Sequence, residues 1–183
     1  MHLPLTSSVV RSWRMSDVPS LVEHANNREI WINLRDRFPH PYTRADGQAF
    51  VKQARRMEPE TFFAIAVDDL AVGGIGFVML SDVERVSAEV GYWLGEAFWG
   101  RGIVTEALVA VTRHAIEQHG LTRVFALPFA HNVGSCRVLE KAGYVLEGRL
   151  RRSAIKDGVI LDQLQYAFIA EPAARSSGEA PLT

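Results

Sequence analysis

The chain has 183 residues, 48% of them hydrophobic, and a formal net charge of −1. That length and apolar fraction suit one domain with a buried core and leave little room for a second. A dedicated nucleic-acid-binding protein usually carries a strong basic excess, so the near-neutral balance argues against a nucleic-acid partner.

Cys136 is the only cysteine, which excludes an internal disulfide and a thiolate metal cluster, and we predict no metal site. No apolar run is long enough to cross a bilayer. The first residues lack the cationic and apolar segments of a signal peptide. These patterns predict a cytoplasmic protein with no membrane partner.

The N-terminal part of the chain predicts one strand and three helices. Residues 9–15 are suited to a strand, and a helix follows over residues 16–26. A short helix is expected over residues 27–34. Thr43 has the residue type and position of an N-cap, so we predict a further helix over residues 45–57.

Three runs rich in valine, isoleucine and aromatic residues come next, over residues 62–67, 71–80 and 88–94. Short polar segments join them, which predicts an antiparallel meander. Glycines interrupt the middle run within residues 73–76. Glycine inside a strand indicates a bulge or another group passing close to the backbone.

The apolar period then becomes helical over residues 104–116, and Gly120 is placed to end that helix. A buried strand over residues 124–129, a helix over residues 133–142 and two paired strands over residues 144–150 and 159–169 complete the pattern. The element order predicts an α/β (α+β) domain over residues 1–170, with helices on both faces of a twisted sheet. Residues 171–183 turn to Ala, Ser, Gly and Pro, which predicts a flexible tail.

A glycine-containing loop precedes the longest predicted helix, with the sequence Phe-Trp-Gly-Arg-Gly-Ile-Val-Thr over residues 98–105. The glycines allow successive amides to point into one concavity, and the helix start adds free N–H groups and the positive end of its dipole. These features favour a pyrophosphate site, to which Arg101 adds charge and Thr105 a hydroxyl. An ordinary loop before a helix is the alternative. The motif is neither a Walker loop nor a dinucleotide fingerprint.

A second motif covers residues 131–144, with the sequence His-Asn-Val-Gly-Ser-Cys-Arg-Val-Leu-Glu-Lys-Ala-Gly-Tyr. Asn132 is placed to cap a helix whose first turn contains Ser135. Capping alone would explain both residues, but a capping Asn can also face a ligand.

In this order the two motifs resemble the GNAT acetyltransferases, in particular the branch of ribosomal-protein-alanine N-acetyltransferases. The resemblance runs from about residue 10 to residue 169 and includes Glu-Val-Gly-Tyr-Trp-Leu at residues 89–94 and the Asp157-Gly158 turn with Asp162. It implies a mostly antiparallel sheet of about seven strands that splays into a groove for acetyl-CoA. It also implies acetyl transfer to a primary amine, of a protein N-terminus or a small molecule, and it is compatible with a homodimer.

The resemblance also implies roles for individual residues. The pantetheine arm of coenzyme A would lie along the strand of Trp93, its pyrophosphate would rest on the glycine loop, and Ser135 would approach the thioester sulfur as the acid. Three positions depart from the general family pattern, namely Trp99, Val104 and Leu139, the last replacing a tyrosine. The cofactor contacts implied are Trp93, Leu94, Trp99, Gly100, Arg101, Gly102, Ile103, Val104, Thr105, Asn132, Ser135, Arg137 and Lys141.

Glu89 is the candidate catalytic base, acting through water, and a solvent-facing structural role is the alternative. If Glu89 is only structural, an α-amine becomes the favoured acceptor, because its pKa of about 7.7–8.0 lies well below the value of about 10.4 for lysine. The walls of the acceptor pocket are predicted to be Trp31, Arg35, Phe38 and Tyr42, with ordinary packing as the alternative. Two other functions stay open: a non-catalytic acyl-CoA-binding regulatory module, and an RNA- or ribosome-associated domain that uses the local arginine clusters.

Overall fold

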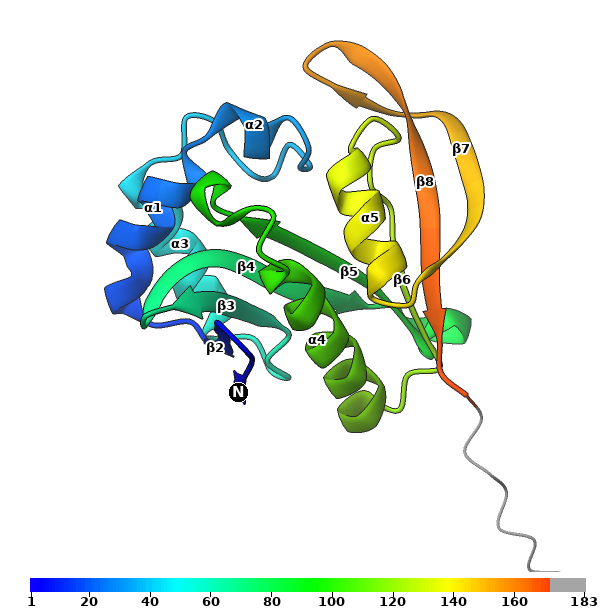
Figure 1. Cartoon of the computed structure of the whole chain (residues 1–183), viewed down its shortest axis with the longest axis horizontal. Helices are drawn as coiled ribbons and strands as arrows, with labels where there is room; N and C mark the ends of the chain where they lie inside the picture. The colour runs from blue at the N-terminus through cyan, green and yellow to red at the C-terminus, as the bar shows by residue number, and fades with distance from the viewer. Residues whose placement is uncertain (172–183) are drawn as a thin grey trace, which may run out of the picture.

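The computed structural model describes residues 1–171, which form a single mixed sheet with helices packed on both of its faces (Figure 1). The sheet has eight strands in the order β1-β2-β3-β4-β5-β6-β8-β7. All neighbouring strands are antiparallel except β5 and β6, which are parallel. The strands are β1 (His2–Pro4), β2 (Val9–Ser12), β3 (Phe62–Val67), β4 (Leu70–Met79), β5 (Ser87–Leu94), β6 (Arg123–Ala126), β7 (Val145–Lys156) and β8 (Val159–Ile169).

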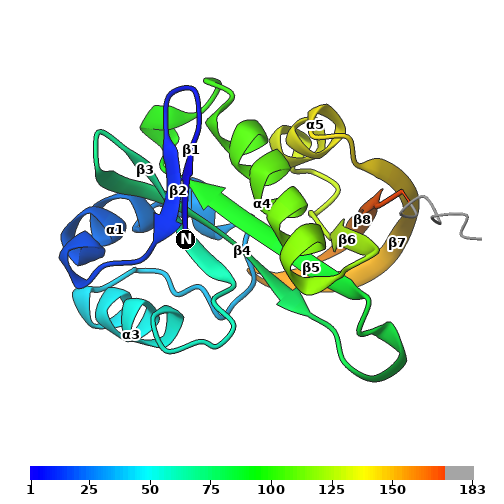
Figure 2. The same ribbon diagram turned by 90° about the horizontal axis from the view of Figure 1, so that it is seen from below.

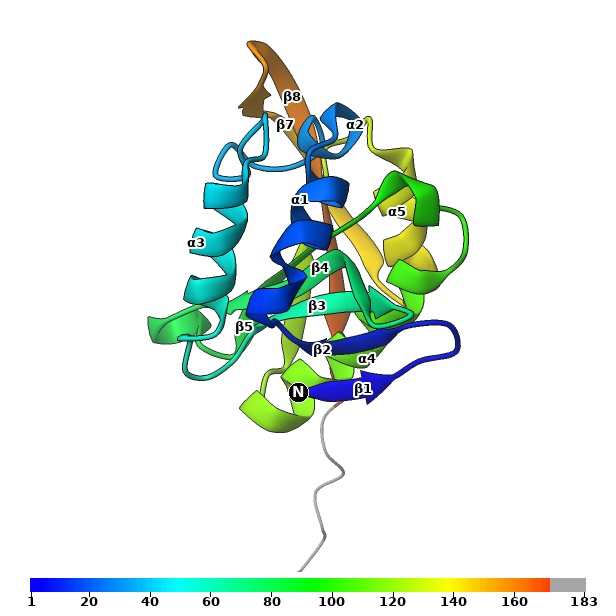
Figure 3. The ribbon, with the colours of Figure 1, turned by 90° about the vertical axis from the view of Figure 1, so that its left-hand side faces the viewer.

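The helices cover the sheet in two pairs, with α1 and α3 on one face and α4 and α5 on the other (Figure 2, Figure 3). They are α1 (Val18–Ala25), α2 (Arg28–Trp31), α3 (Arg44–Ala54), α4 (Ile103–His119) and α5 (Val133–Lys141), with short 3-10 turns η1 (Met15–Asp17), η2 (Asp82–Glu84) and η3 (Glu96–Phe98).

The predicted fold class is confirmed, with one strand more than the expected seven. The missed strand is β1, a three-residue edge strand that ends in a proline. It is too short to show an alternating pattern, and only its pairing with β2 defines it. Apart from Glu171, the predicted tail over residues 171–183 lies outside the described residues.

Local signals set several helix ends as predicted. The Thr43 side chain accepts a hydrogen bond from the backbone N–H of Asp46, and the Asp46 side chain accepts one from the Thr43 N–H, which forms a capping box for α3. The Thr43 hydroxyl also donates to the Asp46 carboxylate, and this bond, followed by the one from the Thr43 N–H, lowers the pKa of Asp46. Gly120 ends α4 in the left-handed region at φ 63°.

Two positions of β4 require glycine because other groups pass close to the backbone there. A Cβ at Gly73 would lie 2.6 Å from the carbonyl oxygen of Trp93, and one at Gly74 would lie 2.8 Å from the Trp93 indole nitrogen. Both positions are too crowded for a side chain, so the predicted close approach is confirmed. The two glycines give Trp93 its place against the sheet.

Alternation along β5 divides its side chains between the two faces of the sheet. Val90, Leu94 and the partly buried Tyr92 pack in the core beneath α4 and α5. Trp93 packs in the core beneath α1 and α3, and Glu89, four residues earlier, shares that face. The strand therefore presents Tyr92 to one face and Glu89 to the other.

No helix of the described residues combines the length and apolar character needed to span a membrane. Over the same residues, no group of three or more His, Cys, Asp or Glu side chains is arranged to hold a metal ion.

Candidate active site

The sheet opens between β5 and β6, the one parallel pair among the strands of residues 1–171. β5 and β6 pair from Ser87 opposite Arg123 to Glu89 opposite Phe125, and no further. β5 continues to Leu94, whereas the chain after β6 stays with β8, since Pro128 accepts a hydrogen bond from the Leu164 N–H at 2.9 Å. The expected splay is therefore confirmed, and it leaves one side of the last β5 residues without a neighbouring strand.

A cavity of about 1320 Å³ occupies this opening and extends across the sheet. It exceeds the range of about 300–1,000 Å³ usual for small-molecule sites, so it has room for more than one ligand. The start of α4 and one side of α5 line one end. The segment between α2 and α3, with part of α3, lines the other. We call these the α4–α5 end and the α2–α3 end.

The glycine loop leads into α4 with an open helix N-terminus. Gly100 and Gly102 have φ of 75° and 78°, and a Cβ at either would meet nothing within 4 Å. These positions are therefore glycine because of their backbone conformation and not because of crowding. Gly102 is the N-cap, and no side chain caps the helix. The N–H groups of the first turn have no intrahelical partner and remain available to a ligand.

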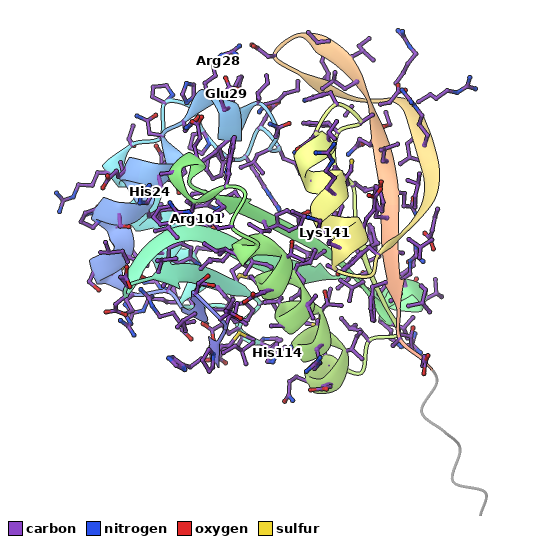
Figure 4. All side chains as sticks on the ribbon, viewed as in Figure 1. His24, Arg28, Glu29, Arg101, His114 and Lys141 are labelled. Atoms are coloured by element: carbon purple, nitrogen blue, oxygen red, sulfur yellow. The ribbon has the colours of Figure 1, made fainter. Side chains whose placement is uncertain are left out.

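Positive side chains line the same end of the cavity as this N-terminus. Arg101 donates a hydrogen bond to the Ala97 carbonyl at 2.9 Å, and its guanidinium lies 5.3 Å from the centre of the Phe98 ring. Arg137 and Lys141 project from α5 into the same cavity. Figure 4 shows Arg101 on the loop before α4 and Lys141 on α5. Together with the helix dipole they favour a phosphorylated ligand at this end.

Both unusual loop residues line the cavity without filling it. The indole N–H of Trp99 donates to the Leu94 carbonyl at 2.8 Å, which ties the loop to the end of β5. Its ring is about half exposed, at 47%. Val104 packs partly against the core beneath α4. The two departures from the family pattern therefore leave the groove open.

A hydroxyl pair lies at the start of α5. The Asn132 side chain accepts a hydrogen bond from the Ser135 N–H at 3.0 Å, which confirms the predicted cap. The Ser135 hydroxyl lies 2.8 Å from the hydroxyl of Tyr92. Burial raises the pKa of Tyr92, so its phenol stays protonated and can donate. Leu139, which replaces the family tyrosine, is fully buried in the core.

Sequence reasoning did not assign Tyr92 to the site. The sequence did contain one signal for it. Tyr92 lies three residues after Glu89 on the same strand, so the two side chains point to opposite faces of the sheet. Only the structure shows that Tyr92 contacts Ser135.

Glu89 occupies the opposite face of β5, and its carboxylate forms an ion pair with Arg35. Phe38 and Tyr42 line the same cavity as aromatic walls. The Phe38 ring lies 4.9 Å from that of Tyr42 and 5.7 Å from that of Trp93. Burial, with a smaller contribution from Asp46, raises the pKa of Tyr42 to about 12.

Trp31 differs from the prediction because its side chain does not line the cavity. Its ring stacks on His40 at 5.5 Å and lies 3.9 Å from the ammonium of Lys156. Lys156 is only 1% exposed and also pairs with Asp36 at 2.9 Å. Trp31 therefore fastens the β7–β8 hairpin, whose tip leans toward α2, and does not form a pocket wall (Figure 1).

The remaining predicted site residues come together in the one cavity, although their individual roles stay predictions. The lining includes Arg35, Phe38, Tyr42, Glu89, Trp93, Leu94, Trp99, Gly100, Arg101, Gly102, Ile103, Val104, Thr105, Asn132, Ser135, Arg137 and Lys141.

A sheet that splays between two parallel strands, with an uncapped helix N-terminus beside the opening, is the architecture of an acyltransferase of the GNAT class. Residues 9–145 match the family model described as acetyltransferase (GNAT) domain. The chain therefore belongs to the GNAT acetyltransferase family.

Curated relatives carry related names. The chain is 36% identical over 104 residues to the probable N-acetyltransferase YjcK of Bacillus subtilis, covering 57% of this chain and 58% of that protein. It is 31% identical over 109 residues to the ribosomal-protein-serine acetyltransferase of Escherichia coli, covering 60% of each. The matched part thus spans about 60% of the length of these relatives.

Solved structures share the fold over more of the chain. RimL, titled a ribosomal L7/L12 α-N-protein acetyltransferase in complex with coenzyme A, superposes with a TM-score of 0.82 at 22% identity, covering 92% of this chain and 98% of that one. RimJ of Mycobacterium smegmatis, in complex with a coenzyme A disulfide, gives a TM-score of 0.77 at 25% identity, covering 89% and 82%.

Proposed function

We propose that this chain transfers an acetyl group from acetyl-CoA to a primary amine, either the α-amine of a protein N-terminus or a small amine, by direct attack on the thioester. The observation that carries the proposal is that one cavity holds the open N-terminus of α4, the Tyr92–Ser135 hydroxyl pair and the Glu89 carboxylate. The proposal includes a cytoplasmic location and a homodimer, with no nucleic-acid or membrane partner.

The residues at the α4–α5 end suit coenzyme A. The uncapped first turn of α4 provides N–H donors for a diphosphate, and Arg101, Arg137 and Lys141 supply positive charge around it. The free side of β5 offers backbone groups to an extended arm, as an open sheet edge does to an added strand. Bound there, acetyl-CoA supplies the activated thioester.

The remaining groups divide the proton transfers between the two faces of β5. In this proposal Glu89 takes a proton from the attacking amine through water, which its position in the cavity supports. Ser135, which is held by Asn132 and paired with Tyr92, gives a hydrogen bond to the departing sulfur. A thiol has a reference pKa of about 8.5, so its thiolate needs only modest stabilisation.

A protein α-amine is the favoured acceptor within this proposal. Relatives are named for ribosomal-protein serine and alanine acetylation. An α-amine, with a pKa of about 7.7–8.0, is also easier for a base to deprotonate than a lysine side chain with a pKa of about 10.4.

A thiol-release screen tests the proposal. Purified protein is mixed with acetyl-CoA and, in turn, with N-terminal peptides, amino acids, polyamines and aminoglycosides, and free coenzyme A is measured. We expect thiol release with at least one amine, and Ser135→Ala should slow it while coenzyme A affinity stays close to that of the wild type. Saturable acetyl-CoA binding with no thiol release for any amine would contradict the proposal and favour a regulatory binding module.

A further inference from the structure

An ion pair between Arg35 and Glu89 lies at the α2–α3 end of the cavity, which the proposed function leaves for the acceptor. Arg35 follows α2, Glu89 lies on β5, and both side chains line the cavity. The pair joins the candidate base to a cation that acetyl transfer itself does not require. That arrangement needs an explanation, because a base already held by a cation is less available to a substrate proton.

The pair can exchange partners at low cost. The Arg35 side chain is 54% exposed and that of Glu89 is 27% exposed, and ion pairs so open to water are weak. Only one guanidinium nitrogen of Arg35, Nη2, donates to Glu89. A guanidinium carries five N–H donors in a planar fork that binds carboxylates in bidentate fashion. Arg35 lines the cavity and makes no other side-chain hydrogen bond within residues 1–171, so its remaining donors could engage a second carboxylate.

Three other charged side chains line this end, namely Glu29, Arg37 and Asp46, and none of them pairs with Glu89. Asp46 is occupied by the capping box with Thr43. Arg37 also lines the cavity, but it makes no ion pair within residues 1–171. Among the arginines of this end, Arg35 alone contacts the candidate base.

We propose that Arg35 recognises a carboxylate on the acceptor, and that this recognition draws Arg35 away from Glu89 and frees the base. The preferred acceptors are then primary amines with an acidic group close to the amine, such as peptides whose first or second residue is Asp or Glu. The inference rests on the proposed acetyl transfer. Arg35 acts as a positioning and specificity residue, and Glu89 remains the candidate catalytic one.

The acceptor enters as an ammonium, and Glu89 takes one of its protons. The nitrogen lone pair forms a C–N bond to the acetyl carbon, and the C–S bond breaks with its electron pair going to sulfur. The second nitrogen proton ends on that sulfur, on the side of β5 where Ser135 lies, and Glu89 returns its proton to water. The products are an amide, coenzyme A thiol and one released proton.

Matched peptides test the inference with thiol release at saturating acetyl-CoA. The pairs are Asp-Ala-Ala amide against Asn-Ala-Ala amide, and Ser-Asp-Ala amide against Ser-Asn-Ala amide, so each pair differs only in a carboxylate and its carboxamide isostere. We expect wild-type protein to favour the acid in kcat/KM on the order of ten-fold, as for a charge-assisted hydrogen bond.

Three variants separate recognition from base function. Arg35→Gln should abolish the preference and raise kcat for the neutral peptide, because Glu89 is no longer paired. Arg37→Gln, the matched control on the same segment, should keep the preference. Glu89→Gln should lower kcat for both peptides while the acid still has the lower KM.

Several results would overturn the inference and leave acetyl transfer standing. One is wild-type protein that turns over the carboxamide peptides as well as or better than the acids, or that accepts only amines without an acidic group. Another is loss of the preference for the acid in Arg37→Gln. The last is an Arg35→Gln variant whose kcat/KM falls by the same factor for the acid and for the carboxamide. Absence of thiol release with every amine of the wider screen would instead remove the proposed function, and this inference with it.

Discussion

The two ends of the cavity are built in different ways. At the α4–α5 end most contacts are local: Asn132 caps a helix three residues along the chain, and the Trp99 indole bonds a carbonyl five residues back, with the Tyr92–Ser135 pair, 43 positions apart, as the exception. At the α2–α3 end they join distant residues, with Arg35 and Glu89 54 positions apart and Lys156 and Asp36 120 apart. One end is made largely of backbone conformation, and the other of side chains that only the fold brings together.

Because of this difference, we expect the two ends to control different properties of the enzyme, cofactor binding at one and acceptor choice at the other. Backbone amides and glycine dihedrals offer the same groups whatever the neighbouring side chains, which suits a ligand of fixed structure. Side-chain pairs change with single substitutions, which suits a specificity that varies among relatives. Substitutions in the glycine loop at the α4–α5 end should therefore alter coenzyme A affinity, and those at the α2–α3 end should alter acceptor kinetics.

The largest effect should come from Glu89→Gln. The substitution keeps the shape of the side chain and removes the base, so kcat/KM for the best amine should fall on the order of 10²-fold, within the range for general base catalysis. Coenzyme A affinity, measured by calorimetry, should stay unchanged because Glu89 lies at the other end. Glu84→Gln, in the exposed turn η2, is the control. Full activity in Glu89→Gln would show that Glu89 is not the base and has only a structural role.

Gly102→Ala should weaken coenzyme A binding on the order of ten-fold. An L-residue at φ 78° costs about 1–2 kcal/mol, and relief of that strain would turn the α4 amides away from the ligand. Gly148→Ala is the matched control, since that glycine has ordinary φ and open space around it on β7. Equal affinity of the two variants would show that the left-handed N-cap is not needed for binding.

Tyr92→Phe should lower kcat by up to about ten-fold, which corresponds to the loss of roughly one hydrogen bond. Coenzyme A affinity should change little. Because Tyr92 and Ser135 act through one 2.8 Å contact, the double variant with Ser135→Ala should be less impaired than the product of the single effects. Burial raises the pKa of Tyr92, so wild-type kcat should show no loss from its ionisation across the neutral and mildly alkaline range. Independent, multiplicative losses would show that the two hydroxyls act separately.

The smallest effect should come from Lys156→Met. Methionine keeps the buried stem but loses the contact with the Trp31 ring, so the free energy of unfolding should fall by about 1 kcal/mol, measured by urea denaturation. The acceptor KM should rise a few-fold as the hairpin loosens, without a change in coenzyme A affinity. Arg14→Met is the control, because the Arg14–Asp69 pair is largely exposed and should contribute almost nothing. Equal losses in both variants would contradict a specific role for Lys156.

The sequence by itself determined the helices, seven of the eight strands and the local signals at the α4–α5 end. Thr43, Asn132, Gly102 and Gly120 act on backbone groups within a few residues, so their residue types are enough to predict the turns and caps they form. The family resemblance added the splayed groove and its ligand.

Only the tertiary structure decided the rest: the short strand β1, the pairing of Tyr92 with Ser135, the placement of Trp31 against Lys156, and the ion pair of Arg35 with Glu89. Each depends on which distant element packs against which, and no periodicity or residue type along the chain encodes that. The reason is physical. A dihedral or a cap depends on neighbours along the chain, whereas a contact between side chains depends on how whole helices and strands are packed.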